Sequence, residues 1–292
     1  MDNSVIIATA LNGHVRIYLA DTTAMVNEAQ KIHDMWPTSL AALGRTMSVT
    51  AIMGLQMKGE EETVTTTING GGSIGTIMVT ADSKGQVKGF VSDPHLYLKY
   101  NDSNKLAVGL VVGHDGYLQV LKNLKLKSSY TSQVSLVSGE IGDDFAYYFA
   151  SSEQIPAIVS VGVLVDTDYS CKAAGCLLIE LLPDHSEEDV EYLEQLLKGL
   201  KPISSVIAEG GQPLAYLQNL FADVKVLDRQ SVRYCCDCSK ERFLRNFLTL
   251  PKQDILELCE EEKTVVHCEF CQKDYEYSQE EMKKLLRYVK DR

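Results

Sequence analysis

The sequence lacks the features that direct a chain into or across a membrane. Its beginning, MDNSVIIATALNGHVRIYLAD, carries Asp2 and has neither the basic segment nor the apolar core of a secretory signal peptide. The most apolar long stretch, Thr38 to Met57, has Arg45 near its middle and Ser and Thr throughout, unlike a membrane span. We therefore expect a cytoplasmic protein without a membrane partner, in a compartment where thiols stay reduced.

An excess of basic charge is also missing. The chain has 28 Lys+Arg against 40 Asp+Glu, a net charge of −12, which argues against a polyanionic partner. Residues 232–292 hold 12 Lys+Arg against 13 Asp+Glu, so this part has a net charge of −1. A zinc module that binds nucleic acid is usually strongly basic. We expect no nucleic-acid partner.

Two glycine-rich motifs are incomplete. Gly71 to Gly75 satisfies G-x-S-x-G, the nucleophile elbow of hydrolases, but an alternating strand pattern (TIMVTAD) follows where that motif needs a helix. Gly70-x4-Gly75 resembles half of a phosphate loop, yet Thr76 and Ile77 stand where Lys and Ser/Thr are required. The glycines are more typical of a hairpin. We expect no nucleotide partner and no catalytic residues, so the chain is not predicted to be an enzyme.

Cysteines are what the sequence has in an informative pattern. Cys236-x-Cys238 is followed after 29 residues by Cys268-x-x-Cys271. Two close pairs from separate segments can supply the four thiolates that Zn²⁺ takes in a tetrahedral site. The spacing leaves the register open, because Cys235-x-x-Cys238 would make an equally good chelate.

The remaining metal-ligating residue types show no such pattern. The six histidines are scattered, without an H-x3-H or H-E-x-x-H pair, and His267 is expected at a surface or strand edge because four thiolates already fill a tetrahedron. Cys171 and Cys176 lie at the entry to an apolar strand, and Cys259 lies on a helical pattern. We interpret these three as packing residues.

Strand and helix patterns follow one another without strict alternation, which predicts an α+β fold with a mixed or antiparallel sheet core packed with helices. A helical linker and a small C-terminal four-cysteine zinc domain complete it. The predicted strands are Val5–Ala10, His14–Leu19, a meander over Glu62–Val91, Lys105–Val112, Tyr117–Leu121, Gln133–Val137, Ala157–Leu164, Gly175–Leu182, Val224–Val232 and a hairpin over Thr264–Tyr277. The predicted helices are Thr23–Asp34, Thr38–Gln56, Gly139–Ser152, Ser186–Leu200, Ser204–Glu209, Pro213–Phe221, Lys240–Leu248, Lys252–Glu261 and Gln279–Lys290.

These patterns divide the chain into two predicted domains. Residues 1–230 form an α+β core, of which residues 184–230 are the helical linker region, and residues 231–292 form the zinc-binding domain. Ala157–Leu164 and Gly175–Leu182 are apolar and β-branched, so we expect them to be central strands.

Core and tail together resemble the heat-shock protein 33 family, the redox-regulated chaperones of bacteria. In the core the resemblance lies in Val137–Ile141, Asp144–Tyr148 and Ser152–Pro156. In the tail it lies in Cys236–Arg242 and Cys268–Cys271. The segments occur in the family's order and span nearly the whole chain.

The resemblance implies one zinc ion per chain, held in the reduced form by Cys236, Cys238, Cys268 and Cys271, which leaves Cys235 outside the motif. Under oxidants it implies the disulfides Cys236–Cys238 and Cys268–Cys271, loss of zinc and a homodimer. The oxidised form is then an ATP-independent holdase for unfolded client proteins, and the reduced form is inactive.

A hydrophobic connector over Ser204–Val226 admits two interpretations. It is a client-binding surface that is masked in the reduced state, or an ordinary helix face packed on the core. Two other functions also remain open: a thiol-disulfide oxidoreductase that uses Cys268-x-x-Cys271, and a zinc-ribbon binding module. The oxidoreductase motif would need a strand before it and a helix after it.

Overall fold

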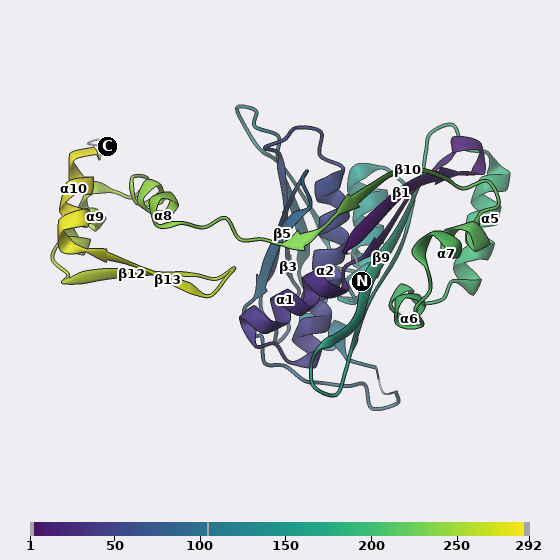
Figure 1. The fold of residues 1–292 in the computed structure, drawn as a ribbon, viewed down its shortest axis with the longest axis horizontal. Helices are drawn as coiled ribbons and strands as arrows, with labels where there is room; N and C mark the ends of the chain where they lie inside the picture. Colours follow the sequence, from purple (N-terminus) through teal and green to yellow (C-terminus); the bar gives the residue numbers. More distant parts are fainter. Residues whose placement is uncertain (1–2, 104, 289–292) are drawn as a thin grey trace. The chain divides into compact units, whose positions relative to one another are not determined.

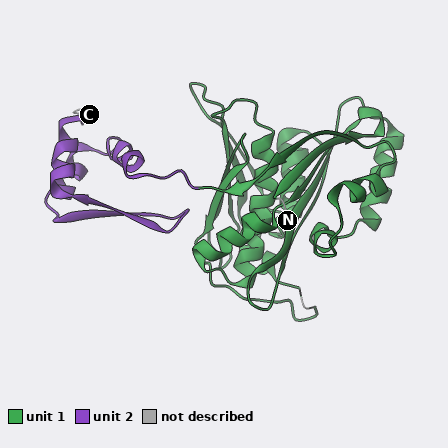
Figure 2. Cartoon of the chain, in the orientation of Figure 1, with its two compact units in different colours: residues 1–235 green, residues 236–292 purple. Residues whose placement is uncertain are grey.

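The structure is a computed structural model that describes residues 3–103 and 105–288. The chain divides into two compact units, Met1–Cys235 and Cys236–Arg292 (Figure 2). Each unit has its own hydrophobic core. Among the described residues, every helix is too short or too polar to cross a lipid bilayer.

A five-stranded antiparallel sheet runs through the first unit (Figure 1). Its central strands are apolar on both faces because helices cover both sides of the sheet. In order across the sheet, its strands are β10 (Lys225–Ser231), β1 (Ser4–Ala10), β2 (Val15–Asp21), β9 (Cys171–Leu181) and β8 (Ala157–Val165).

A six-stranded sheet forms the other layer of this unit. Its strands alternate buried and half-buried residues in the meander that the sequence predicts. In order, its strands are β11 (Arg233–Tyr234), β5 (Gln86–Val91), β4 (Ile77–Asp82), β3 (Thr63–Asn69), β6 (Tyr117–Asn123) and β7 (Tyr130–Ser135). All pairs are antiparallel except β11 with β5, so the sheet is mixed.

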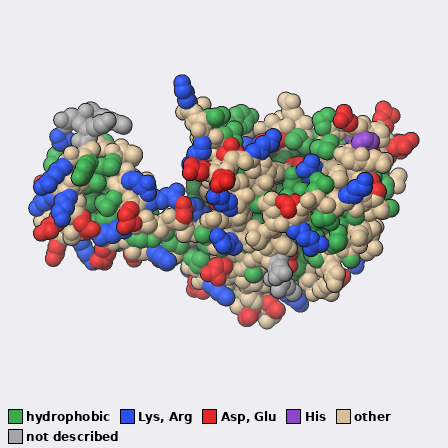
Figure 3. Space-filling model, turned by 45° about the horizontal axis from the view of Figure 1, so that its top comes forward, with side chains coloured by type: hydrophobic (Ala, Val, Ile, Leu, Met, Phe, Trp, Pro, Cys, Tyr) green, Lys and Arg blue, Asp and Glu red, His purple; other side chains and the backbone are tan. Residues whose placement is uncertain are grey.

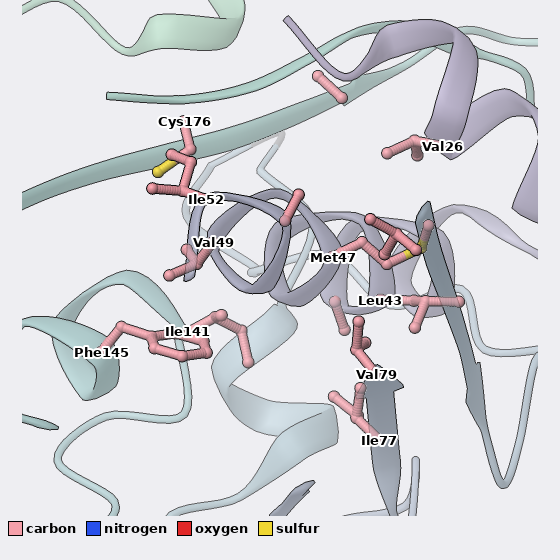
Figure 4. Packing of buried hydrophobic residues seen from close by; sticks show 14 of the residues in the cluster. Val26, Leu43, Met47, Val49, Ile52, Ile77, Val79, Ile141, Phe145 and Cys176 are labelled. Atoms are coloured by element: carbon pink, nitrogen blue, oxygen red, sulfur yellow. The ribbon is translucent and has the colours of Figure 1, made fainter. Parts of the chain in front are cut away.

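Helix α2 (Pro37–Leu55) packs between the two sheets, next to α1 (Thr23–His33). Every residue of α2 is buried except the half-buried Arg45. Its buried hydroxyls find partners: Ser48 Oγ donates to the Gly44 carbonyl at 2.7 Å, and the Thr50 and Thr66 hydroxyls lie 2.7 Å apart. Figure 4 shows side chains from both sheets, α2 and α4 meeting in this core.

The outer face of the five-stranded sheet is covered by the linker helices (Figure 1). These are α5 (Glu187–Gly199), α6 (Ile203–Ala208) and α7 (Pro213–Leu220). Of the hydrophobic connector, Val206, Ile207, Leu217 and Phe221 are buried against this sheet. In this structure the connector is therefore packed on the core.

The glycine-rich segment after β3 is a turn between β3 and β4, as predicted, and no helix follows Ser73. A Cβ on Gly72 would lie 2.2 Å from the Val111 carbonyl oxygen, and one on Gly70 would lie 2.3 Å from that of Gly113. Backbone packing against the neighbouring segment thus explains why these positions are glycine.

Three predicted elements differ from the structure. The predicted strand Lys105–Val112 is wrong, because its second half is the short helix α3 (Val108–Val112). The predicted helix Gly139–Ser152 is α4 (Gly142–Tyr148), continued by a π-helical turn over Phe149–Glu153. Strand β8 lies at a sheet edge and not at the centre. Periodicity alone does not distinguish a short buried helix from a strand, nor a central strand from an apolar edge.

The second unit places a β-hairpin against three short helices. The predicted helix Gln279–Lys290 is α10 followed by a 3₁₀ turn over Leu286–Tyr288, and Lys290 lies outside the described residues. On the face shown in Figure 3, basic and acidic side chains of this unit are interspersed. The elements of this unit are α8 (Lys240–Phe247), α9 (Lys252–Leu258), β12 (Lys263–Cys268), β13 (Lys273–Ser278) and α10 (Gln279–Leu285).

Candidate metal centre

Two segments of the second unit carry the four predicted thiols. Cys236 and Cys238 lie in the extended chain just before α8, which begins after the N-cap Ser239. Cys268 ends β12, and Cys271 lies in the turn that leads into β13. Backbone N–H groups of Cys271 and Gln272 both donate to the Cys268 carbonyl and close this turn.

The four sulfur atoms form one cluster. The Sγ atoms of Cys236, Cys238, Cys268 and Cys271 all lie within 4.8 Å of one another. The Cys236 and Cys268 sulfurs are 3.8 Å apart, and those of Cys238 and Cys271 are 3.2 Å apart. Both short distances join one segment to the other, so the cluster ties the chain before α8 to the hairpin.

Burial and hydrogen bonds together set the pKa values of three of these thiols. Burial works against the thiolate of Cys238, but hydrogen bonds from the Tyr275 hydroxyl and from the neighbouring thiols outweigh it and lower its pKa to about 7. The Tyr275 oxygen lies 3.1 Å from Cys238 Sγ. Burial and the hydrogen bond with Cys238 raise the pKa of Cys271 to about 11, and burial raises the pKa of Cys236. Without a metal, Cys238 therefore ionises before Cys236 and Cys271.

The hairpin that presents the second pair rests on a small aromatic core. Tyr277 is fully buried, stacks edge-to-face on Phe247 with ring centroids 5.3 Å apart, and donates its hydroxyl to the Lys240 carbonyl at 2.8 Å. Phe243 packs against Tyr275 at 5.2 Å. Helix α8 is thus held against β13, directly beside the first cysteine pair.

The donor set fits zinc. Four thiolates at about 2.3 Å from a tetrahedral Zn²⁺ stand about 3.8 Å from each other. The Cys236–Cys268 separation of 3.8 Å meets this distance, and that of Cys238 and Cys271 is somewhat shorter. Soft sulfur donors without a carboxylate or water favour zinc over hard cations such as Mg²⁺ and Ca²⁺. These four residues could therefore hold one metal ion.

Comparisons with known proteins give this arrangement a context. The profile of a family described as Hsp33 protein matches residues 3–278. The chain is 42% identical over 293 residues to a 33 kDa chaperonin of Geobacillus kaustophilus strain HTA426, covering 99% of both chains. A 33 kDa chaperonin of Bacillus velezensis is 45% identical over 280 residues, covering 95% of this chain and 96% of its own.

The chain belongs to the Hsp33 family. Its fold also matches a crystal structure from Thermotoga maritima, a 33 kDa chaperonin described as a heat shock protein 33 homolog. The TM-score is 0.88 at 33% identity, and the match covers 99% of both chains. The resemblance seen in the sequence is thereby confirmed, together with the α+β fold class.

Other cysteines of this Hsp33 family member lie apart from the cluster. Cys235 is not among the four grouped thiols; its N–H donates to the Val87 carbonyl at 2.8 Å, in the first unit. Cys171 and Cys176 are buried on β9, where burial raises the pKa of both, that of Cys171 to about 12. Cys259 is buried in the core of the second unit.

His267 lies at the hairpin surface, as predicted. Its Nδ1 is 2.7 Å from Asp274 Oδ1 and its Nε2 is 3.1 Å from Gln272 Oε1. The hydrogen bond with Asp274 raises the pKa of the imidazole. Both ring nitrogens are thus occupied by other partners than a metal.

Sequence reasoning missed Tyr275. It lies seven residues after Cys268 on the returning strand, where the alternation of β13 gives it the same face as the buried Tyr277.

Cys268-x-x-Cys271 is flanked by two strands, β12 and β13, and no helix follows it directly. The setting that the oxidoreductase interpretation requires is therefore not present around this motif.

Proposed function

We propose that this chain is a redox-regulated, ATP-independent holdase that binds unfolding proteins under oxidative stress. It is inactive when it is reduced and zinc-bound. The observation that carries the proposal is the cluster of four thiols in a small unit, within a chain whose relatives are named chaperonins. Membership of the Hsp33 family supports a chaperone function, and hence the binding of client proteins.

The proposed ligands are Cys236, Cys238, Cys268 and Cys271, with one zinc ion per chain. Bound zinc keeps its cysteine ligands deprotonated at neutral pH, and thiolates are the form of cysteine that peroxide and hypochlorous acid attack. In the reduced protein the site thus links the two chain segments that carry its cysteines, and it also reacts with oxidants.

Oxidation would rearrange this cluster. We propose that the disulfides Cys236–Cys238 and Cys268–Cys271 form, each by transfer of two electrons to one peroxide molecule, which takes up two protons from solvent and leaves as two water molecules while the zinc ion is released. The sulfur separations of 3.8 Å and 3.2 Å join one pair to the other, whereas each proposed bond lies within a pair. Forming these disulfides therefore dismantles the link between the two segments.

Losing that link should unfold the second unit. Its buried core is a small cluster, completed by partly buried side chains, whereas a structural zinc site contributes about 10–16 kcal/mol in small modules. The buried members of that cluster are Phe247, Ile255, Cys259, Tyr277, Met282 and Leu285.

In this proposal residues 1–230 are the chaperone body and residues 231–292 are the switch. Within the linker region, residues 184–230, the hydrophobic connector Ser204–Val226 supplies the client surface when the apolar faces of α6 and α7, which cover the five-stranded sheet in this structure, become accessible. The active form is a homodimer. We place the protein in the cytoplasm, where reduced thiols can hold a metal, and we expect it to need no nucleotide.

Zinc content and light scattering of an aggregating client protein test the proposal, measured before and after treatment with hydrogen peroxide under mild warming, without nucleotide. We expect the reduced protein to hold about one zinc per chain and to leave aggregation unaffected. The oxidised protein should release the zinc and suppress aggregation. An oxidised protein that keeps its zinc and does not suppress aggregation contradicts the proposal.

A matched pair of variants separates the ligands from other thiols of the same unit. Cys268→Ser removes a proposed ligand, and Cys259→Ala removes a buried thiol of the neighbouring core. Only Cys268→Ser should lose zinc in the reduced state. Equal zinc loss in both variants would mean that the folding of the unit, and not ligation, controls the metal.

A further inference from the structure

A cavity lies in the first unit, between the five-stranded sheet and the hydrophobic connector. Helices α6 and α7 lie against the outer face of this sheet (Figure 1), and the cavity, of about 350 Å³, separates that face from the turn that joins them. Its size is at the lower end of the range typical of small-molecule sites. We call it the connector cavity. Its wall consists of Ser4, Ile6, Asp21 and Arg229 from the sheet, and of Ile207 and residues 210–213 from the connector.

Strand register places the two charged residues of the connector cavity on the same face of the sheet. Ser4 of β1 pairs with Asp21 of β2, and Ile6 of β1 pairs with Arg229 of β10. Directly paired residues of antiparallel strands project to the same side, as do residues two apart along one strand. Ile6 belongs to the hydrophobic cluster beneath the linker helices, so this side is the outer one. A carboxylate and a guanidinium thus border one cavity from opposite sides of β1.

Asp21 brings a buried carboxylate with one oxygen left over. The residue is 8% exposed, and its Oδ1 accepts hydrogen bonds from the Thr23 N–H at 3.0 Å and from the Thr23 hydroxyl at 2.7 Å. Among the described residues, no group donates to Oδ2 and no basic side chain forms an ion pair with Asp21. A buried charge without a counter-charge is destabilising. The carboxylate is therefore suited to receive a cation from a ligand.

Arg229 brings the opposite charge to the same cavity. It is exposed on β10, and within the described part of the chain its guanidinium forms no ion pair, with Asp21 or with any other carboxylate. The neighbouring Asp228 carboxylate accepts from the Gln230 amide and from the Arg229 backbone N–H instead. A guanidinium offers parallel N–H donors that match the two oxygens of a carboxylate. Arg229 is therefore available to bind a carboxylate of a ligand.

The remaining wall of the connector cavity is largely apolar. Ile6, Ile207 and Pro213 line it. Gly210 and Gly211 keep the wall of the turn free of side chains, and the φ of +75° at Gly210 favours glycine there. The N–H groups of both glycines donate to carbonyls of α6, so the turn is fixed. The cavity thus combines two separated charges with an apolar surface.

We propose that the connector cavity binds an α-amino acid with an apolar side chain. The ammonium group of the ligand pairs with Asp21, and its carboxylate pairs with Arg229. Its side chain packs on Ile6, Ile207 and Pro213. A free amino acid supplies all three features at once, whereas a simple amine or a simple carboxylate supplies only one of the two charges.

Binding in this cavity has a consequence for the connector. One part of the wall belongs to the sheet and the other to the connector, so the site is complete only while the connector is packed on the sheet. A ligand that binds one of two conformations shifts the equilibrium towards that conformation. The bound amino acid therefore opposes exposure of the connector and keeps the reduced protein inactive. This consequence rests on the proposed function, whereas binding itself does not.

Titration calorimetry of the reduced, zinc-loaded protein with L-leucine tests the site. The matched probes are L-leucinamide, which lacks the carboxylate, and isocaproate, which lacks the ammonium group. We expect L-leucine to bind saturably and each matched probe to bind at least about tenfold more weakly, because each lacks one charge-assisted contact. Absence of saturable L-leucine binding, or equal affinity for L-leucine and either matched probe, would overturn the proposal.

Two variants assign the charges. Arg229→Gln should abolish the preference for L-leucine over L-leucinamide, and Asp21→Asn, which keeps an acceptor for Thr23, should abolish the preference over isocaproate. Lys225→Gln removes a positive charge from the same strand outside the cavity and should leave both preferences unchanged. Arg229 is exposed, so its substitution leaves the core intact. An unaltered preference in Arg229→Gln would refute the site, whatever the stability of Asp21→Asn.

Hydrogen exchange of the connector tests the consequence. In the reduced protein, saturating L-leucine should slow amide exchange in α6 and α7, and it should not do so in Arg229→Gln. L-leucine should likewise delay the onset of aggregation suppression during treatment with peroxide. Selective binding of L-leucine with unchanged exchange in α6 and α7 would show that the ligand does not hold the connector on the sheet.

Failure of the cavity and failure of the proposed holdase are distinguishable. If the oxidised protein suppresses aggregation but the reduced protein does not prefer L-leucine to its matched probes, the cavity proposal is wrong and the holdase stands. If L-leucine binds selectively but oxidation neither releases zinc nor suppresses aggregation, the cavity proposal stands and the holdase is wrong.

Discussion

Arg45 is the one side chain of helix α2 that is not fully buried, and it is held by a residue 95 positions further along the chain. Its Nη1 donates to the Glu140 carboxylate at 2.7 Å and to the Glu140 carbonyl at 3.0 Å. The other carboxylate oxygen accepts from the Tyr100 hydroxyl and from the Gly109 N–H. This network joins α2 to the segment before α4. It pairs the positive charge of the Arg45 guanidinium with the Glu140 carboxylate, and an unpaired charge in the core would be destabilising.

The charge of Glu140 should stabilise the fold in a pH-dependent way. Burial opposes ionisation, but hydrogen bonds from Tyr100 and Arg45 outweigh it and hold the pKa of Glu140 below its ordinary value of 4.5. A depressed folded pKa stabilises the protein above the unfolded pKa, and the contribution is lost as the pH falls through the folded value. Glu140→Gln should cost about 1–3 kcal/mol of unfolding free energy at pH 7.

Denaturant unfolding at pH 7 and at successively lower pH checks this expectation. The difference between wild type and Glu140→Gln should shrink as the pH falls below 4.5. Glu60→Gln, at a side chain that is 89% exposed, serves as the control and should be near-neutral throughout. A cost for Glu140→Gln that does not change with pH would show that shape, and not charge, is what the network requires.

Single residues also mark the limit of what sequence can predict. Arg45 is recognisable as a charge that disfavours a membrane span, but its partner follows from the packing of distant segments. A cluster of two cysteine pairs could be predicted because each pair is local and the thiolate chemistry is specific, but the spacing left Cys235 as an alternative to Cys236, and only the family resemblance chose between them. Tyr275 could not be predicted, since its role depends on where the hairpin meets the chain before α8.

At the scale of elements, α2 must pass close to its neighbours, and two of its glycines lie at such close approaches, Gly54 at the six-stranded sheet and Gly44 at β8 and α1. A Cβ at Gly54 would lie 2.7 Å from both Ala81 Cβ and the Asp82 carbonyl oxygen on β4. At Gly44 it would meet Val163 and Val26 side chains at 2.9 Å. Glycine at these two positions thus allows α2 to pack closely against its neighbours. The hydrophobic pattern of the sequence does not show this, because α2 is buried on all sides and has no polar face.

Gly54→Ala should therefore be destabilising although alanine favours a helix. The backbone carbonyl of Asp82 cannot easily move, and overpacking of this kind costs about 1–3 kcal/mol. Gly199→Ala is the matched control at the end of α5, where a Cβ meets no atom within 4 Å, and it should be neutral or slightly stabilising. Thermal unfolding followed by circular dichroism compares them. A melting temperature of Gly54→Ala equal to that of Gly199→Ala would mean that α2 can shift freely.

Elements with a clear periodicity were predictable, and those set by their neighbours were not. The alternating meander of β3 to β5 and the amphipathic helix α5 follow from residues close in sequence. The edge position of β8 and the parallel pairing of β11 with β5 arise from segments far apart. The two-residue β11 carries too few residues for any pattern.

At the scale of the whole molecule, the two units differ in what stabilises them. The first has two extensive hydrophobic clusters on the two faces of one sheet, whereas the second has a small cluster beside four thiols. A domain of about 60 residues rarely gains more than a few kcal/mol from its own core. The second unit should therefore depend on the metal that we propose its four thiols bind, and the first should not.

Removing the metal should destabilise the second unit and leave the stability of the first unit unchanged. When the reduced protein is treated with a zinc chelator, the amides of β12, β13 and α10 should lose protection against hydrogen exchange, while those of α2 and β9 keep theirs. Re-addition of zinc should restore protection in the second unit. Cys259→Ala should respond like the wild type, because its thiol lies in the core and not in the cluster. Retained protection of β12 and β13 in the zinc-free protein would mean that the aromatic contacts of Tyr277 and Phe247 suffice for folding, and that the four cysteines do not control the unit's structure.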